Sequence, residues 1–300
     1  AMNAKKTKKI VVLATGGTIA GLANDVAKPQ NYTAGQVHVA DLLHGLSADG
    51  VELVTEQVAQ IDSKDMSYAV WQSLLGRVAH WVAQDDVQGV VITHGTDTLE
   101  ETAYFLQTVL QPTKPVAMTC AMLPANAPDS DGPGNLKDAL SWVQQPNASG
   151  VSVVCAGQVH AGNAVQKSHS CQRNPFTSQA GVTHPAALHV PTLAQVLACT
   201  DWPRVELVQN HAGADGRLVR ASMAHDAPQG WVVAGTGNGT LHHELEAALL
   251  DAQKQGAQVL RASRCAQGGV QSREADVLPH AGGLTAVQAR VALLLHLVAQ

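Results

Sequence analysis

The sequence predicts an α/β protein with two α/β domains: a larger N-terminal domain whose parallel-rich sheet is flanked by helices, and a smaller C-terminal domain. Short aliphatic, β-branched runs alternate with longer segments of helical periodicity, which is typical of parallel sheets with right-handed crossovers. Aromatic residues make up only 3% of the 300 residues, so aliphatic side chains must build the core, as in buried parallel strands. The alternation fades between residues 181 and 203 and then resumes.

The N-terminal domain is expected to cover residues 1–180, with five strands and four helices. Thr33 and Asn135 are the expected N-caps of the first and last of these helices. The strands are expected at 10–14, 51–58, 89–93, 115–119 and 151–155, and the helices at 33–46, 65–84, 98–110 and 135–143.

Residues 181–203 hold three prolines and show weak periodicity, so we interpret them as a linker. The C-terminal domain, residues 204–300, then repeats the alternation on a smaller scale, and Thr285 is the expected cap of its last helix. Its strands are expected at 204–209, 230–235 and 258–263, and its helices at 241–255 and 285–300.

Composition excludes several classes of protein. Hydrophobic residues are 45% and charged residues 14%, so the chain is not disordered. A net charge of -5 does not indicate the basic surface with which proteins bind nucleic acid or a membrane. Five scattered cysteines without a CxxC pair argue against a disulfide framework or a zinc site, and the fourteen histidines form neither HxxxH nor HExxH. No metal is therefore expected.

The start of the chain decides the expected location. Lysines at residues 5–9 precede the apolar run 10–14, but this run is shorter than the roughly 7–15 residues of a secretory core. No run approaches the roughly 20 apolar residues of a membrane span. We expect a soluble cytoplasmic protein; a leader removed ahead of residue 2 would instead indicate the periplasm.

Polar clusters follow the expected strands, and ligands of parallel sheets bind beyond the carboxyl ends of strands. The first cluster is ATGGTIAG, residues 14–21. It has neither a phosphate-loop pattern nor an expected helix start at Thr18. It is therefore either a plain turn, in which threonines bond to the backbone, or a place where a threonine hydroxyl reacts. The connection to residue 35 is expected to be a mobile lid.

The second cluster, GVVITHGTDTLEE at 89–101, crowds threonines and acids at the end of an apolar strand. Capping of the next helix by Thr96 or Asp97 would explain one residue, and a functional site would explain the whole set. In QIDSKDM (60–66), capping is the better explanation. The polar residues of these two clusters are Thr93, His94, Thr96, Asp97 and Thr98, and Asp62, Ser63 and Asp65.

A threonine nucleophile needs a base, because its hydroxyl is weakly nucleophilic at neutral pH. Lys167 is one candidate, since a lysine desolvated beside Thr96 and Asp97 could accept a proton. His94 is the other.

Together these stretches resemble the bacterial-type L-asparaginase family, the amidohydrolases that release ammonia from asparagine and often glutamine. ATGGTIAG (14–21) is similar to the first threonine motif of the family, and GVVITHGTDTLEETAYF (89–105) to the second. The resemblance extends from about residue 9 to the C-terminus and is strongest before residue 140.

The resemblance implies catalytic roles. Thr18 would attack the side-chain amide carbon with help from Tyr32, and Thr96, Asp97 and Lys167 would form a second catalytic group. An acyl-enzyme ester would form and be hydrolysed to aspartate, without a metal or another cofactor.

The resemblance also implies how the substrate is held. The backbone amide of Thr96 would stabilise the oxyanion, and Asp97 would bind the α-ammonium group. Ser63 would hold the α-carboxylate, and the carbonyl of Ala121 would lie near the amide. Lys64 stands where family members often carry Gln or Glu, which bears on substrate size.

In the family an acidic residue of a partner subunit completes the site, and Glu274 or Asp276 would serve here. This implies a homodimer or homotetramer with the site at the subunit interface. Two alternatives remain open: an amidotransferase-type or other amide hydrolase, and a non-catalytic amino-acid sensor.

Overall fold

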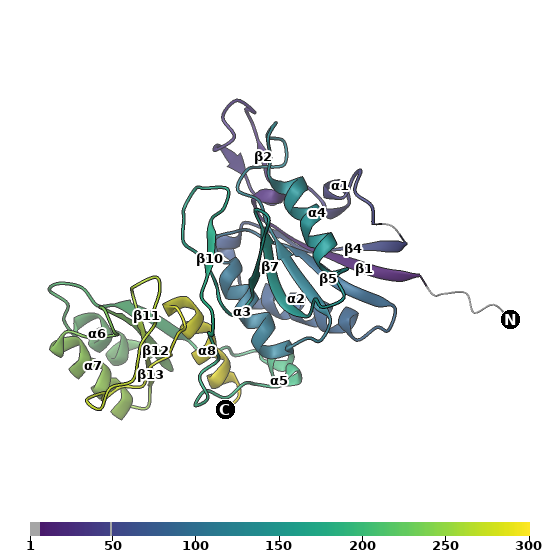
Figure 1. The fold of residues 1–300 in the computed structure, drawn as a ribbon. Helices are drawn as coiled ribbons and strands as arrows, with labels where there is room; N and C mark the ends of the chain where they lie inside the picture. Colours follow the sequence, from purple (N-terminus) through teal and green to yellow (C-terminus); the bar gives the residue numbers. More distant parts are fainter. Residues whose placement is uncertain (1–6, 49) are drawn as a thin grey trace. The chain divides into compact units, whose positions relative to one another are not determined.

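A computed structural model describes residues 7–48 and 50–300 of the chain (Figure 1). The lysines at residues 5 and 6 lie outside the described residues. The chain divides into two compact units, Ala1–Ser178 and Gln179–Gln300. Each unit is an α/β structure, which confirms the predicted fold class.

The first unit is built on one sheet of six strands in the order β4-β1-β5-β6-β7-β8. The pairs from β4 to β7 are parallel, and only β8 runs antiparallel to its neighbour. All five expected strands are present, several of them longer than expected. Their bounds are β1 Lys8–Gly16, β4 Val51–Ile61, β5 Val87–Thr93, β6 Pro115–Thr119, β7 Gly150–Cys155 and β8 Gln158–Ala161.

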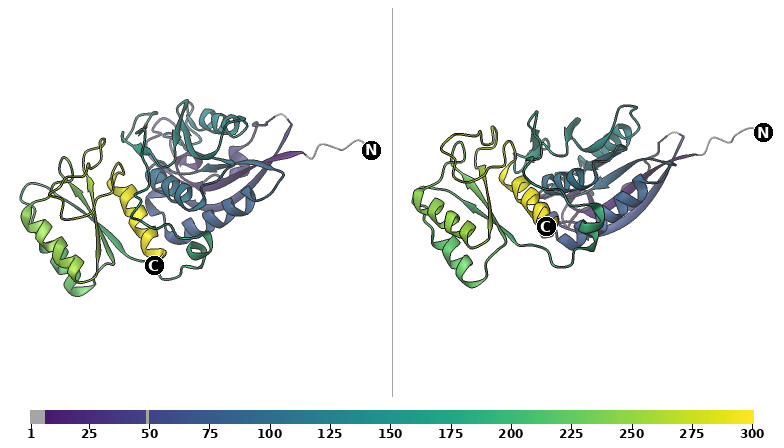
Figure 2. Two further views of the ribbon diagram at one scale, coloured as in Figure 1. Left: turned by 60° about the horizontal axis from the view of Figure 1, so that its bottom comes forward. Right: turned by 90° about the horizontal axis from the view of Figure 1, so that it is seen from below.

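Helices cover both faces of this sheet, because alternate strand residues point to opposite faces. Ile10, Val12 and Ala14 of β1 pack with α4 (Gly132–Trp142) and α1 (Val39–Leu42) in one apolar cluster. The other face is covered by α2 (Tyr68–Val82) and α3 (Leu99–Leu110), as the turned views show (Figure 2).

The prediction of a helix over 33–46 is wrong, because the backbone donors there are taken by other segments. The N–H groups of Gln36 and Val37 both donate to the carbonyl of Ala20, at 2.7 and 2.8 Å. Only the four residues of α1 are helical, with His38 as N-cap. Thr33 lies instead in β3 (Tyr32–Thr33), which pairs antiparallel with β2 (Leu22–Ala23).

Asn135 is not the N-cap of α4, which begins three residues earlier after Asp131. The Asn135 side chain is buried inside the helix and joins two strand ends. Its Nδ2 donates to the carbonyl of Cys120 at 3.0 Å, and its Oδ1 accepts the N–H of Ala156 at 3.0 Å. One bond holds the residue that follows β6, and the other holds the residue that follows β7.

A second small sheet, absent from the sequence prediction, joins β9 (Val165–Lys167) and β10 (Phe176–Ser178) in antiparallel register. Lys167 is the last residue of β9 and lies opposite Phe176. The ribbon therefore places this lysine in regular structure.

The second unit has three parallel strands, β11 (Val205–Gln209), β12 (Gly230–Gly235) and β13 (Gln258–Ser263). Alternate residues of these strands pack against α6 and α7 on one face, whereas α8 contacts all three strands. Thr285 caps α8 as predicted, with its hydroxyl accepting the N–H of Gln288. The helices are α5 Leu193–Ala198, within the segment interpreted as a linker, α6 Arg217–His225, which was not predicted, α7 His243–Lys254 and α8 Ala286–Val298.

Within the described residues, none of the helices combines the length and the apolar character that crossing a membrane requires.

Candidate active site

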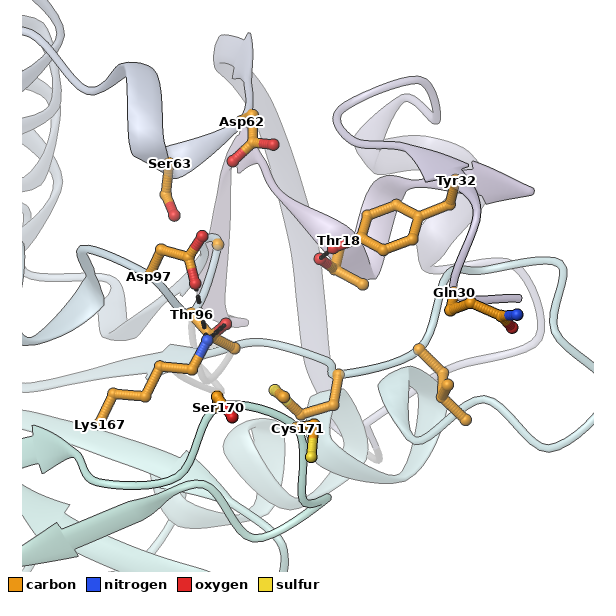
Figure 3. Close-up of a pocket in the computed structure, with 13 residues that line it drawn as sticks. Thr18, Gln30, Tyr32, Asp62, Ser63, Thr96, Asp97, Lys167, Ser170 and Cys171 are labelled. Carbon is orange, nitrogen blue, oxygen red and sulfur yellow. Dashed lines mark hydrogen bonds and ion pairs between the residues drawn. The ribbon is translucent and has the colours of Figure 1, made fainter. Parts of the chain in front are cut away.

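A cavity of about 390 Å³ opens in the first unit, beyond the carboxyl ends of β1, β4 and β5. Most of the predicted site residues line it (Figure 3). The lining residues are Thr18, Gln30, Tyr32, Asp62, Ser63, Gly95, Thr96, Asp97, Met122, Leu123, Lys167, Ser170 and Cys171.

The two threonine motifs meet backbone to backbone at Gly17 and Gly95. A Cβ placed on Gly17 would lie only 2.5 Å from the Cα of Gly95, and Gly17 has φ +80°. A side chain on Gly17 would push these two backbones apart, so this position needs glycine. This contact brings Thr18 and Thr96 to the same cavity.

Thr18 begins a single 3₁₀ turn, Thr18–Ala20, where no helix start was predicted. Its Oγ1 lies 2.6 Å from the hydroxyl oxygen of Tyr32. Thr15 differs from Thr18, because its buried hydroxyl donates to the carbonyl of Thr93 at 2.8 Å. Thr15 therefore supports the turn, and Thr18 is the threonine whose hydroxyl faces the cavity.

The connection that carries Tyr32 is not structureless, because β2 and β3 form a short hairpin within it. Asn126 holds this hairpin from the loop after β6: its Oδ1 accepts the N–H of Ala23 at 2.8 Å and its Nδ2 donates to the Ala23 carbonyl at 2.7 Å. Tyr32 is 38% exposed. Its hydroxyl is thus placed on Thr18 by a hairpin that is tied at its base.

Lys167 connects the hydroxyl group of Thr96 with the carboxylate of Asp97 in the second motif. Its Nζ donates to Thr96 Oγ1 at 2.8 Å and to Asp97 Oδ1 at 2.7 Å. The Lys167 side chain is 15% exposed and that of Asp97 56%. Figure 3 shows this group and the Thr18–Tyr32 pair on different sides of the cavity. The ammonium is paired and shielded, while more than half of the Asp97 side chain stays exposed.

Capping by Thr96 or Asp97 is wrong, because the N-cap of α3 is Thr98. The Thr98 hydroxyl donates to the Ser63 carbonyl at 2.8 Å. A Cβ on Gly95 would lie 2.5 Å from Ser63 Oγ. The buried Ser63 is therefore held against the second motif.

The prediction that QIDSKDM caps the following helix is wrong, because Ser67 caps α2. Asp62 caps the short 3₁₀ turn Ser63–Asp65 instead, by accepting the N–H of Lys64 at 3.2 Å. The Lys64 ammonium donates to Asp65 at 3.0 Å, and both side chains are exposed.

His94 is buried beside the site but is not a base. Burial lowers its pKa to about 4, although the Gly95 carbonyl opposes this shift. Its Nδ1 lies 2.7 Å from that carbonyl and its Nε2 lies 2.8 Å from Thr102 Oγ1. A neutral ring with both nitrogens engaged can only support the loop.

The loop after β6 is held by Asp131, whose carboxylate accepts the N–H groups of Met122 and Leu123 at 2.9 and 3.0 Å. These two residues line the cavity. Ala121 is buried next to them and is not among the described residues that line it.

Two family models match the chain: Asparaginase, N-terminal, over residues 9–189, and Glutaminase/Asparaginase C-terminal domain, over residues 204–300. The chain belongs to the asparaginase family. It is an enzyme of the L-asparaginase type, as the motifs predicted, and so an amidohydrolase.

Individual relatives agree with this membership. The chain is 36% identical to "L-asparaginase 2" of Escherichia coli (strain K12), over 96% of this chain and 88% of that protein. It is 33% identical to the "Glutaminase-asparaginase" of Pseudomonas fluorescens biotype A, over 90% and 79%. The crystal structure of a probable cytoplasmic L-asparaginase from Campylobacter jejuni superposes with a TM-score of 0.88 at 30% identity, covering 98% of this chain and 96% of that one.

Seven lining residues were not predicted as site residues from the sequence. One of them, Asp62, was considered only as a cap. For the other six the signal was weak, because they lie in loops, two of them in the connection between the unpredicted strands β9 and β10. They are Gln30, Gly95, Met122, Leu123, Ser170 and Cys171.

The two candidate acids of the second unit differ in their partners. Asp276 pairs with Arg261 at 2.9 Å and accepts the N–H of Arg273 at 2.9 Å, and these contacts lower its pKa. Glu274 is exposed. No group of three or more His, Cys, Asp and Glu side chains among the described residues is placed to hold a metal ion.

Proposed function

We propose that this asparaginase hydrolyses the side-chain amide of L-asparagine to L-aspartate and ammonia, with Thr18 as the nucleophile. The observation that carries the proposal is the 2.6 Å contact of Thr18 Oγ1 with Tyr32, in the same cavity as the Thr96–Lys167–Asp97 group. A threonine that only supported a turn would bond to the backbone, as Thr15 does.

In the first half-reaction the oxygen of Thr18 attacks the amide carbon, and its proton moves toward Tyr32. The tetrahedral oxyanion is stabilised by the backbone N–H of Thr96 and a positioned water; losing one such donor costs about 3–4 kcal/mol in other enzymes. Collapse of the intermediate breaks the C–N bond, and the nitrogen takes the proton and leaves as ammonia. An aspartyl ester on Thr18 remains.

In the second half-reaction a water attacks the ester carbonyl, with Thr96, Asp97 and Lys167 as the group that orients it. Hydrolysis releases aspartate and returns the proton to Thr18. The ammonium of Lys167, held by two hydrogen bonds of 2.7 and 2.8 Å, keeps the Thr96 hydroxyl oriented throughout.

The substrate's own charges suit the cavity. The side chain of Asp97 is 56% exposed to solvent, and its carboxylate would bind the α-ammonium group. The Ser63 hydroxyl would bind the α-carboxylate. Ala121 would contribute its carbonyl near the amide. We further propose glutaminase side activity, because a relative carries the name glutaminase-asparaginase.

The proposed assembly is a homodimer or homotetramer in which the C-terminal domain, residues 204–300, lends an acid to the catalytic domain of a partner, residues 1–180. We favour Glu274 for this role, because Asp276 is already held by Arg261. The expected cytoplasmic location is supported by the neighbour described as cytoplasmic.

An ammonia-release assay on L-asparagine and L-glutamine tests the proposal, with the Thr18→Ala variant in parallel. Wild-type protein should release ammonia, and the variant should lose most of it while its circular dichroism stays the same. Full activity in a verified Thr18→Ala protein would rule out the mechanism. Tight binding of asparagine without turnover would favour a sensor, and turnover of other amides alone would favour the other-amidase alternative.

A further inference from the structure

Glu100 carries a half-buried carboxyl group that the proposed reaction does not use. It is the second residue of α3, and it lies outside the described lining of the cavity. Its Oε1 accepts the main-chain N–H of Lys167 at 3.2 Å. The carboxyl group therefore contacts the backbone of the lysine whose ammonium bonds to Thr96 and Asp97 in the cavity.

Lys167 is held at both ends by one stretch of chain. Its ammonium bonds to Thr96 and Asp97 at 2.8 and 2.7 Å, and its N–H bonds to Glu100. It ends a strand of three residues that pairs with another strand of three residues, Phe176–Ser178. The buried side chains of Val165 and Phe176 pack this ribbon into the unit, whereas Lys167 is the last residue before the loop. Glu100 binds the backbone at that end, directly at the lysine.

The pKa of the Glu100 carboxyl group lies near neutral pH. Burial raises its pKa to about 7, the negative charge of Glu101 adds to the effect, and the N–H and ammonium of Lys167 oppose it. Both protonation states are therefore populated near neutral pH. The other titratable groups on elements packed against α3 are Tyr68, Arg77 and His80 of α2 and Cys155 of β7.

We propose that Glu100 is a positioning residue, whose carboxylate holds the backbone of Lys167 so that the ammonium stays on Thr96 and Asp97. The inference rests on the proposed function of that group. A hydrogen bond to an ionised acceptor is roughly twice as strong as one between neutral groups. Protonation of Glu100 therefore weakens the anchor, and activity falls as the pH drops through about 7.

The test compares Glu100→Gln, Glu100→Leu and wild type. Gln keeps an acceptor oxygen but neither charge nor titration, and Leu removes the acceptor. Glu244→Gln is the matched control, because Glu244 is the second residue of α7 and exposed. Two quantities are measured: kcat/KM on L-asparagine between about pH 6 and 8, where a titrating group would show, and hydrogen exchange of the Lys167 amide.

We expect Glu100→Leu to lower kcat/KM by about a hundredfold, as a displaced catalytic group does, and to speed exchange of the Lys167 amide by about tenfold or more. Glu100→Gln should lose less activity than Glu100→Leu at the upper pH. It should also lack the fall in kcat/KM toward acid pH, with a midpoint near pH 7, that wild type shows. The control should follow wild type in both measurements.

Two results would overturn the proposal: the same acid limb in wild type and Glu100→Gln, or unchanged exchange of the Lys167 amide in both variants. If Glu100→Leu does not fold, Glu100→Gln alone decides. If wild type releases no ammonia, the proposed function fails; the exchange data then decide whether Glu100 anchors Lys167.

Discussion

Replacing Glu100 by Gln is expected to change how the stability of the protein depends on pH. Burial, reinforced by the charge of Glu101, raises the pKa of Glu100 from its ordinary value of 4.5 to about 7, against the opposing N–H of Lys167. The folded chain therefore binds this proton more tightly than the unfolded chain. The stability that the protonated carboxyl provides is present below about pH 4.5 and is lost as the pH rises toward 7.

The magnitude follows from the two pKa values. The folded chain binds this proton roughly 300-fold more tightly than the unfolded chain. Each factor of ten is worth about 1.4 kcal/mol, so the difference is about 3 kcal/mol in total. Gln has nearly the same shape and does not titrate, so the difference in unfolding free energy between the two proteins isolates this carboxyl. Between about pH 5 and 8, wild type should lose about 2–3 kcal/mol relative to Glu100→Gln.

The assay is urea unfolding followed by circular dichroism at several pH values. Glu244→Gln serves as the control, and its curve should stay parallel to that of wild type because the residue is exposed. The argument from burial is refuted if the difference in unfolding free energy between wild type and Glu100→Gln stays constant with pH. It is also refuted if that difference changes in the opposite direction.

Other changes test the geometry of the site. Tyr32→Phe should lower kcat by about a hundredfold or more, because the 2.6 Å contact with the nucleophile is lost, and steady-state kinetics beside a thermal melt checks that stability is kept. Gly95→Ala should raise KM, since its Cβ would lie 2.5 Å from the hydroxyl oxygen of Ser63. Gly134→Ala is the control, because a Cβ there meets none of the described atoms within 4 Å. An equal KM in both variants would contradict the prediction. Thr15→Val should cost about 1 kcal/mol in denaturant unfolding through a lost buried hydrogen bond, and the folded protein should stay active.

The framework of the fold could be predicted because the strands are continuous apolar runs. Residues 10–14, 89–93 and 115–119 are buried on both faces of the sheet, and such runs are recognisable from composition alone. The helix over 33–46 has a helical pattern as well. The competing partners of its N–H groups come from Ala20, which a local pattern does not reveal.

The ribbon that holds Lys167 could not be predicted, because strands of three residues are too short to show periodicity. Lys167 entered the prediction through the family resemblance and the chemistry of a desolvated lysine. Glu100 was visible only as a residue that favours a helix N-terminus. Its contact with the Lys167 backbone joins positions 67 apart in the chain.

The cluster after β5 shows the same division. The sequence left its threonines and Asp97 open between helix capping and a functional site, and the structure gives the cap to Thr98. That Thr18 and Thr96 share a cavity depends on the contact between Gly17 and Gly95, which only the folded backbone supplies.

The central claim, that Thr18 carries the acyl group, is tested most directly by trapping the intermediate. Wild-type protein is mixed with L-asparagine, quenched in acid within the first turnovers and digested, and the peptide that contains Thr18 is examined by mass spectrometry. We expect an aspartyl ester on Thr18 in the wild-type peptide and none in the corresponding peptide of Thr18→Ala. An ester on another residue, or ammonia release by Thr18→Ala at the wild-type rate, would contradict it.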